Sequence, residues 1–143
     1  MKNKLSITIF IICVLSVVIT SCEKKPGDAD AMLIGKWDQV SLKIINYYDN
    51  VKQNETDQSY DAGYIVMEIF DDGTAKKYVN GVISDSFYWD VNGELLLMTG
   101  NSGIVQTAEF SVSDNNLTLM WAIQETYDGH IIRSDYMGVY KKQ

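Results

Sequence analysis

The fold is decided by residues 71–103, which read DDGTAKKYVNGVISDSFYWDVNGELLLMTGNSG. Short runs rich in β-branched and aromatic residues alternate here with Asp-Asp-Gly, with Asn-Gly twice and with Gly-Asn-Ser-Gly. Asn-Gly and Asp-Gly accept the positive φ angles of tight hairpin turns. This stretch therefore predicts a succession of β-hairpins.

The same pattern extends from Met32 to the end of the chain, with further breaks at Asp114-Asn115 and Asp128-Gly129. This part has no proline and no long apolar stripe of helical period, so we expect an all-β domain. Residues 46–61 are expected to form its one long loop. Eight strands are predicted, at residues 33–46, 62–70, 74–79, 82–91, 94–99, 103–113, 116–126 and 130–141.

The two-residue turns fix which residues face each other, and paired residues share a face of the sheet. The Asn80-Gly81 turn pairs Tyr78 with Ile83. By the same rule Phe87 pairs with Met98, Trp89 with Leu96, Phe110 with Leu119, Ala108 with Trp121, Trp121 with Tyr136, and Leu117 with Tyr140. Most apolar side chains then collect on one face. An antiparallel meander with one apolar face is expected to close into an eight-stranded up-and-down β-barrel.

The N-terminus reads as an export signal. Lys2 and Lys4 precede an uncharged apolar run, and Ile19-Thr20-Ser21-Cys22 resembles the bacterial lipobox, whose cysteine is acylated before cleavage. We expect a signal peptide at 1–21, a lipid anchor on Cys22 in the outer membrane, a polar tether at 22–31 and a barrel domain at 32–143. The alternative is an ordinary secretory signal cut near Ser21, which leaves a free thiol.

Composition excludes several function classes. The 143-residue chain carries a net charge of −7, which becomes −9 without Lys2 and Lys4, so nucleic acid is not expected as a partner. Neither Cys13 nor Cys22 falls in the domain, which excludes disulfides, cysteine-rich zinc sites and a thiol nucleophile there. His130 is the one histidine and is expected in a solvated turn. We predict no metal site, no cofactor and no catalytic residue, and we expect the protein not to be an enzyme.

Three short motifs carry a family resemblance. Leu33-Ile34-Gly35-Lys36-Trp37 opens the first predicted strand, Asp71-Asp72-Gly73-Thr74 forms the first short turn, and Tyr140-Lys141-Lys142 lies near the chain end. Residues 32–143 thereby resemble the lipocalin superfamily, and more closely the small lipocalin-like lipoproteins of Bacteroidetes. The resemblance implies a barrel closed at its Trp37 end and open under a long first loop. This sequence lacks the arginine that packs on the tryptophan in the family. Lys141 or Lys142 is predicted to cover Trp37 instead.

The predicted mouth lies at the end opposite Trp37, beside loop 46–61. Tyr47, Tyr48 and Tyr60 flank that loop and either line the entrance or anchor the loop to the rim. A small hydrophobic or amphipathic ligand is expected inside the barrel. The residues predicted to line its site are Tyr78, Ile83, Met98, Gln106, Trp121, Ile123, Ser134 and Tyr136.

Two features leave alternatives open. Lys76 and Asp85 are predicted to pair across two strands, either inside the barrel or, if a β-bulge intervenes, facing solvent. The barrel is either hollow or filled by side chains, and a filled barrel favours a protein-interaction module of a cell-envelope assembly. Such a module would use an outer apolar patch of Val66, Phe70, Leu95 and Leu97. An enzyme rests only on analogy with rare catalytic lipocalins.

Overall fold

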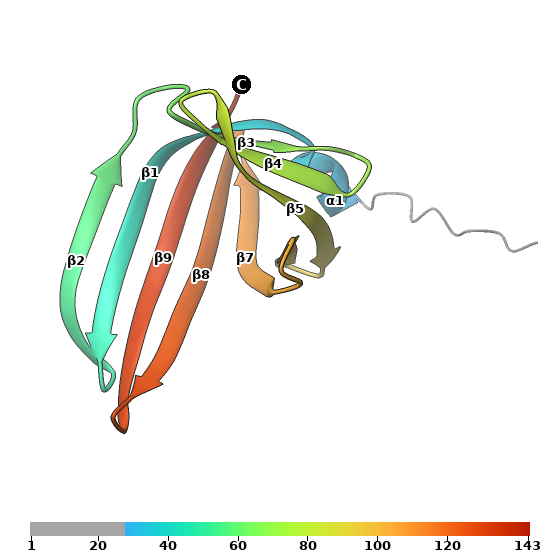
Figure 1. The fold of residues 1–143 in the computed structure, drawn as a ribbon. Coiled ribbons are helices and arrows are strands. Elements are labelled where there is room, and N and C mark those ends of the chain that lie inside the picture. Colours follow the sequence, from blue (N-terminus) through green and yellow to red (C-terminus); the bar gives the residue numbers. More distant parts are fainter. Residues whose placement is uncertain (1–27) are drawn as a thin grey trace, which may run out of the picture.

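The computed structural model describes residues 28–143, which form one short helix and nine antiparallel strands (Figure 1). The expected signal peptide and the first six residues of the tether, Cys22 among them, lie outside the described residues. In chain order the elements are α1 Asp28–Leu33, β1 Gly35–Tyr48, β2 Val51–Ser59, β3 Ile65–Ile69, β4 Thr74–Val79, β5 Val82–Asn92, β6 Leu95–Gly100, β7 Val105–Ser113, β8 Asn116–Tyr127 and β9 His130–Lys142.

Eight of the strands close a barrel. Consecutive strands from β3 to β9 pair with their neighbours, and β1 joins the two ends because it pairs with both β3 and β9. The Asn80-Gly81, Asp114-Asn115 and Asp128-Gly129 turns have positive φ at both residues, as their sequences predict. The predicted all-β, eight-stranded up-and-down barrel is confirmed.

The prediction of a long loop at 46–61 is wrong. Residues 51–59 form a further strand, β2, which pairs with the second half of β1 around a turn at Asp49 and Asn50. This strand reads VKQNETDQS and is exposed along its whole length, so it lacks the alternation of apolar residues that marks a strand. It is held instead by backbone pairing and by Lys43 of β1, which forms ion pairs with Glu55 and Asp57.

The end of the barrel near Trp37 is closed. Trp37 is fully buried, and its indole Nε1 donates a hydrogen bond of 2.6 Å to the carbonyl oxygen of Leu33, the buried last residue of α1. Lys142 Nζ lies 5.2 Å from the centre of the Trp37 ring, which confirms the predicted cation for one of the two lysines. Residues 28–31, which were expected to belong to the tether, form the first part of α1, the helix that closes this end. The core around it comprises Met67, Ile69, Ala75, Leu96, Ala108, Leu117, Leu119 and Tyr140.

The opposite end is splayed. The ladder between β7 and β8 ends at Glu109 and Met120, so the predicted pairing of Ala108 with Trp121 does not form. Beyond this point β8 pairs only with β9, and β2, β1, β9 and β8 continue together past the rest of the barrel (Figure 1). We call this four-stranded extension, residues 44–56 and 121–136, the overhang.

A β-bulge in β5 changes which side chains enter the barrel. Tyr78 pairs with Ile83 as predicted, but Lys77 pairs with Asp85, which leaves Ser84 as the extra residue. Its hydroxyl donates a hydrogen bond to the carbonyl oxygen of Lys77. The predicted pairing of Lys76 with Asp85 is therefore wrong. Lys76 points outward over the Phe70 ring at 5.6 Å, and Lys77 takes the inward position.

Candidate functional site: the interior cavity and the overhang

The barrel is hollow toward its splayed end. A cavity of about 370 Å³ lies between the core and the turn that joins β6 to β7. Its walls are mostly apolar, as is usual for sites that take small apolar ligands. They comprise Ile65, Met67, Phe87, Met98, Ile104, Leu119, Trp121 and Tyr140, together with the polar or small residues Lys77, Asp85, Gly100, Ser102 and Gln106. The barrel is therefore not filled by side chains, as the alternative prediction had it.

Three of the predicted ligand-site residues line this cavity: Met98, Gln106 and Trp121. Met98 pairs directly with Gln106 on the next strand, so an apolar and an amide side chain stand together on one wall. Tyr140 lies deeper, and its burial raises the pKa of its phenol to about 12. This hydroxyl therefore stays neutral at physiological pH and adds no charge to the cavity.

Three more predicted residues, Ile123, Ser134 and Tyr136, lie on the same face of the sheet but beyond the cavity, on the overhang. Trp121 and Tyr136 are directly opposite each other on β8 and β9, and their rings stack with centroids 5.2 Å apart and planes at 5°. Since Trp121 also lines the cavity, this stack joins the cavity to the overhang.

The remaining two predicted residues, Tyr78 and Ile83, do not face the interior. The Tyr78 hydroxyl donates a hydrogen bond of 3.0 Å to the carboxylate of Glu68 on the outer face, and Ile83 shares that face and is 52% exposed. The inward placement predicted for both is wrong because the bulge at Ser84 shifts the alternation of β5 by one residue.

The sequence analysis did not predict two polar features of the site. One is a pair of charged residues in the cavity wall, and the other is a group of polar side chains on the overhang. Lys77 and Asp85 are cross-strand neighbours and both line the cavity. Further out, Asn46 of β1 accepts a hydrogen bond from the Ser134 hydroxyl at 2.7 Å and donates one to Asn54 of β2 at 2.6 Å. Asn54 was hidden in the predicted loop, although the Asp49-Asn50 turn before it has the same chemistry as the Asp114-Asn115 turn.

The tip of the overhang is tied together by polar contacts. Asp49 accepts hydrogen bonds from His130 Nδ1 at 2.7 Å and from the backbone N–H of Ile131 at 2.8 Å, while Tyr48 stacks on the His130 ring. The Ile131 and His130 hydrogen bonds hold the pKa of Asp49 below its ordinary value. His130 thus joins two turns. Within residues 28–143 no cluster of three or more His, Cys, Asp or Glu side chains is placed to bind a metal ion.

None of the three tyrosines flanking residues 46–61 lines the cavity. Tyr47 lies under the Arg133 guanidinium at 5.6 Å, Tyr48 belongs to the tip, and Tyr60 stacks on Tyr64 while its hydroxyl bonds Gln58. Because residues 51–59 form β2, there is no long loop for these tyrosines to anchor, and they contact neighbouring strands and turns instead.

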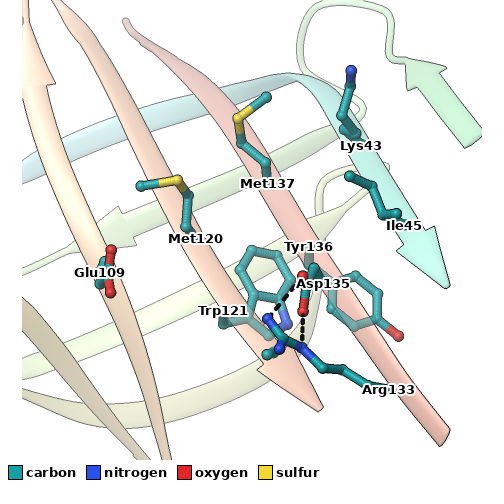
Figure 2. Close-up of a pocket in the computed structure, with 10 residues that line it drawn as sticks. Lys43, Ile45, Glu109, Met120, Trp121, Arg133, Asp135, Tyr136 and Met137 are labelled. Carbon is teal, nitrogen blue, oxygen red and sulfur yellow. Dashed lines mark hydrogen bonds and ion pairs between the residues drawn. The ribbon is translucent and has the colours of Figure 1, made fainter. Parts of the chain in front are cut away.

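A second hollow, of about 350 Å³, lies along β7, β8, β9 and β1 where the ladder between β7 and β8 ends, and it is lined by residues of the outer face together with Trp121 and Tyr136. Figure 2 shows Met120, Met137 and Ile45 in it, flanked by Lys43 and by the Arg133 guanidinium, which bonds the Asp135 carboxylate at 2.6 and 2.9 Å. The outer patch predicted from Val66, Phe70, Leu95 and Leu97 is not continuous, because β4 and β5 separate β3 from β6.

Comparisons with known proteins add no family to this description: no protein-family model, curated protein or solved structure matches the chain. Within the described part of the chain, no helix is long and apolar enough to cross a membrane.

Proposed function

We propose that this protein is a lipocalin-like lipoprotein of the cell envelope that binds a small hydrophobic or amphipathic molecule inside its barrel. The observation that carries the proposal is the cavity of about 370 Å³, closed at the Trp37 end and continuous with the aromatic stack of Trp121 and Tyr136 at the other. Apolar walls with a few polar groups favour ligands of this class. Burial of the ligand's apolar surface stabilises the complex, and the polar groups orient its polar end.

The proposed lipid anchor rests on the sequence of residues 1–22 and places the barrel near the outer membrane, where apolar molecules are concentrated. When cells are labelled with a radioactive fatty acid, the wild-type protein is expected to carry the label and the Cys22→Ser protein is expected to lack it. A wild-type protein without label would contradict the anchor. We propose binding rather than catalysis, since the Asp49 and His130 contact lies in turns at the tip of the overhang and not in the cavity.

The ligand site is tested with two neighbouring residues of β7 that face opposite ways. Gln106 lines the cavity and Thr107 does not. A tryptophan at position 106 fills the cavity, so Gln106→Trp is expected to weaken binding of the neutral fluorescent probe N-phenyl-1-naphthylamine about tenfold or more, equivalent to about 1.4 kcal/mol. Thr107→Trp, the matched control, is expected to bind like the wild type. Equal loss in both variants, or no fluorescence change with the wild-type protein, contradicts the proposed site.

The second candidate is a protein-interaction module. The outer hollow around Met120 and Met137 favours it, since Met120 is 41% exposed and apolar residues gathered in a surface hollow are typical of contact sites. The hollow interior and the divided outer patch favour the first candidate.

A further inference from the structure

The inner face of the overhang carries cross-strand rows of side chains that change in chemistry with distance from the cavity. The first row holds Ile44, Tyr136 and Trp121, with Thr56 of β2 at its edge. The second, two residues further along each strand, holds Asn46, Ser134 and Ile123, with Asn54 at its edge. Two residues of a strand span about 7 Å. A molecule leaving the cavity therefore meets an aromatic row and then, about 7 Å further, a polar one.

The aromatic row suits an apolar chain. The stacked rings of Trp121 and Tyr136 support each other, and both are only partly buried. Their remaining surface continues the apolar wall of the cavity, because Trp121 belongs to both. Extending an apolar ligand over this stack buries further apolar area on both sides.

The polar row offers both a donor and an acceptor. The Ser134 hydroxyl donates a hydrogen bond to Asn46 Oδ1, and the amide nitrogen of Asn46 donates one to Asn54 Oδ1. The oxygen of Ser134 keeps lone pairs, and the amide nitrogen of Asn54 keeps its two protons. Since a hydroxyl group both donates and accepts, a head group with several hydroxyls satisfies both ends of this chain.

The charges around this row favour a neutral head group. The row itself has no ionisable side chain, and the next residue inward-facing on β8 is Glu125, which pairs with Ile132. The barrel domain and tether together carry a net charge of −9. A charged head group of either sign would give up its hydration here without meeting an opposite charge in the row itself, and an anionic one would in addition be repelled by the net negative charge.

From these rows, and resting on the proposed function, we infer that the ligand is an elongated amphiphile with an uncharged, hydroxyl-bearing head group. Its apolar end occupies the cavity, its middle lies on Trp121 and Tyr136, and its head group bonds the row of Asn46, Asn54 and Ser134.

The test compares three molecules that share an eight-carbon chain and differ in the head: octyl β-glucoside, octanoate and octylammonium. Each is titrated into the protein below its critical micelle concentration by isothermal titration calorimetry. The glucoside is expected to bind about tenfold more tightly than either charged molecule, a difference of about 1.4 kcal/mol. Octanoate or octylammonium binding as tightly as the glucoside would overturn the inference.

A pair of variants locates the head group. Asn46→Leu removes the central amide while keeping the size of the side chain, and is expected to lower affinity for octyl β-glucoside about tenfold. Gln124→Leu removes an amide from the outer face of β8 and is expected to change nothing. Binding of N-phenyl-1-naphthylamine to both variants reports that the barrel is intact. Unchanged glucoside affinity in Asn46→Leu would overturn the placement of the head group.

The two proposals fail in different ways. If the wild-type protein binds N-phenyl-1-naphthylamine but shows no preference for the glucoside, the cavity function stands and the head-group inference is wrong. If the wild-type protein binds neither the probe nor any of the three octyl compounds, the proposed function itself is wrong.

Discussion

Trp37 is the residue on which the closed end of the barrel depends. It is fully buried, its indole N–H bonds the carbonyl oxygen of Leu33, and Lys142 covers its ring. The Gly-x-Trp motif alone indicates a buried tryptophan, but not which groups it contacts. Here Trp37 fixes the C-terminal end of α1, and this closes the barrel at the end opposite the mouth.

Three substitutions separate these contributions. Trp37→Phe leaves the Leu33 carbonyl oxygen without its donor and opens a void, so the free energy of unfolding is expected to fall by about 2–4 kcal/mol. Lys142→Ala removes an exposed cation–π contact and is expected to cost about 0.5–1 kcal/mol. Lys141→Ala, on the outer face, serves as the control. Urea unfolding measures all three, and equal losses for Lys142→Ala and Lys141→Ala would contradict the ring contact.

Single residues also explain where inference from sequence stopped. Turn dipeptides placed most hairpins, because the positive φ angles that Asn, Asp and Gly adopt are a local property. The bulge at Ser84 depends on how two strands fit together, and no local pattern announces it. That one extra residue puts Ile83 on the outer face beside Tyr78, and it pairs Asp85 with Lys77, which lines the cavity, rather than with Lys76.

At the scale of elements, β2 shows that a strand can form without an apolar face. Its nine residues are all exposed and mostly polar, and sequence patterning reads such a segment as a loop. It pairs with β1 through eight residue positions, and Lys43 of β1 forms ion pairs with Glu55 and Asp57 of β2. The polar row of the overhang includes Asn54 only because this strand brings it beside Asn46.

The charged link predicts a measurable titration. Glu55 of β2 accepts hydrogen bonds from Lys43 at 2.8 Å and from Lys52, and these hold the pKa of its carboxyl at about 2. Because this folded-state pKa lies below the ordinary value of 4.5, the stabilisation is present above pH 4.5 and is lost as the pH falls toward 2.

Side-chain carboxyl NMR checks this directly. Glu55 is expected to titrate near pH 2 in the wild-type protein and at a distinctly higher pH in Lys43→Met. Lys36→Met, which removes a lysine paired with Glu68 instead, is the control and should leave the Glu55 titration in place. A wild-type Glu55 that titrates near its ordinary value of 4.5 would show that β2 is not held in this way.

At the scale of the whole molecule, the barrel is closed at one end and drawn out into a four-stranded sheet at the other (Figure 1). Alternation and turn chemistry predict closure, because eight strands with one apolar face have few other ways to bury it. They do not predict that the ladder between β7 and β8 ends at Glu109 and Met120. That early end creates the open mouth and exposes the inner face of the overhang.

Four methionines report whether the ligand enters the barrel. Met67 and Met98 line the inner cavity, while Met120 and Met137 line the hollow on the outer face. The measurement is the change in the methionine methyl signals by NMR when N-phenyl-1-naphthylamine is added to the wild-type protein. We expect the signals of Met67 and Met98 to shift and those of Met120 and Met137 to stay. Shifts confined to Met120 and Met137 would contradict binding inside the barrel and move the binding site to the outer face.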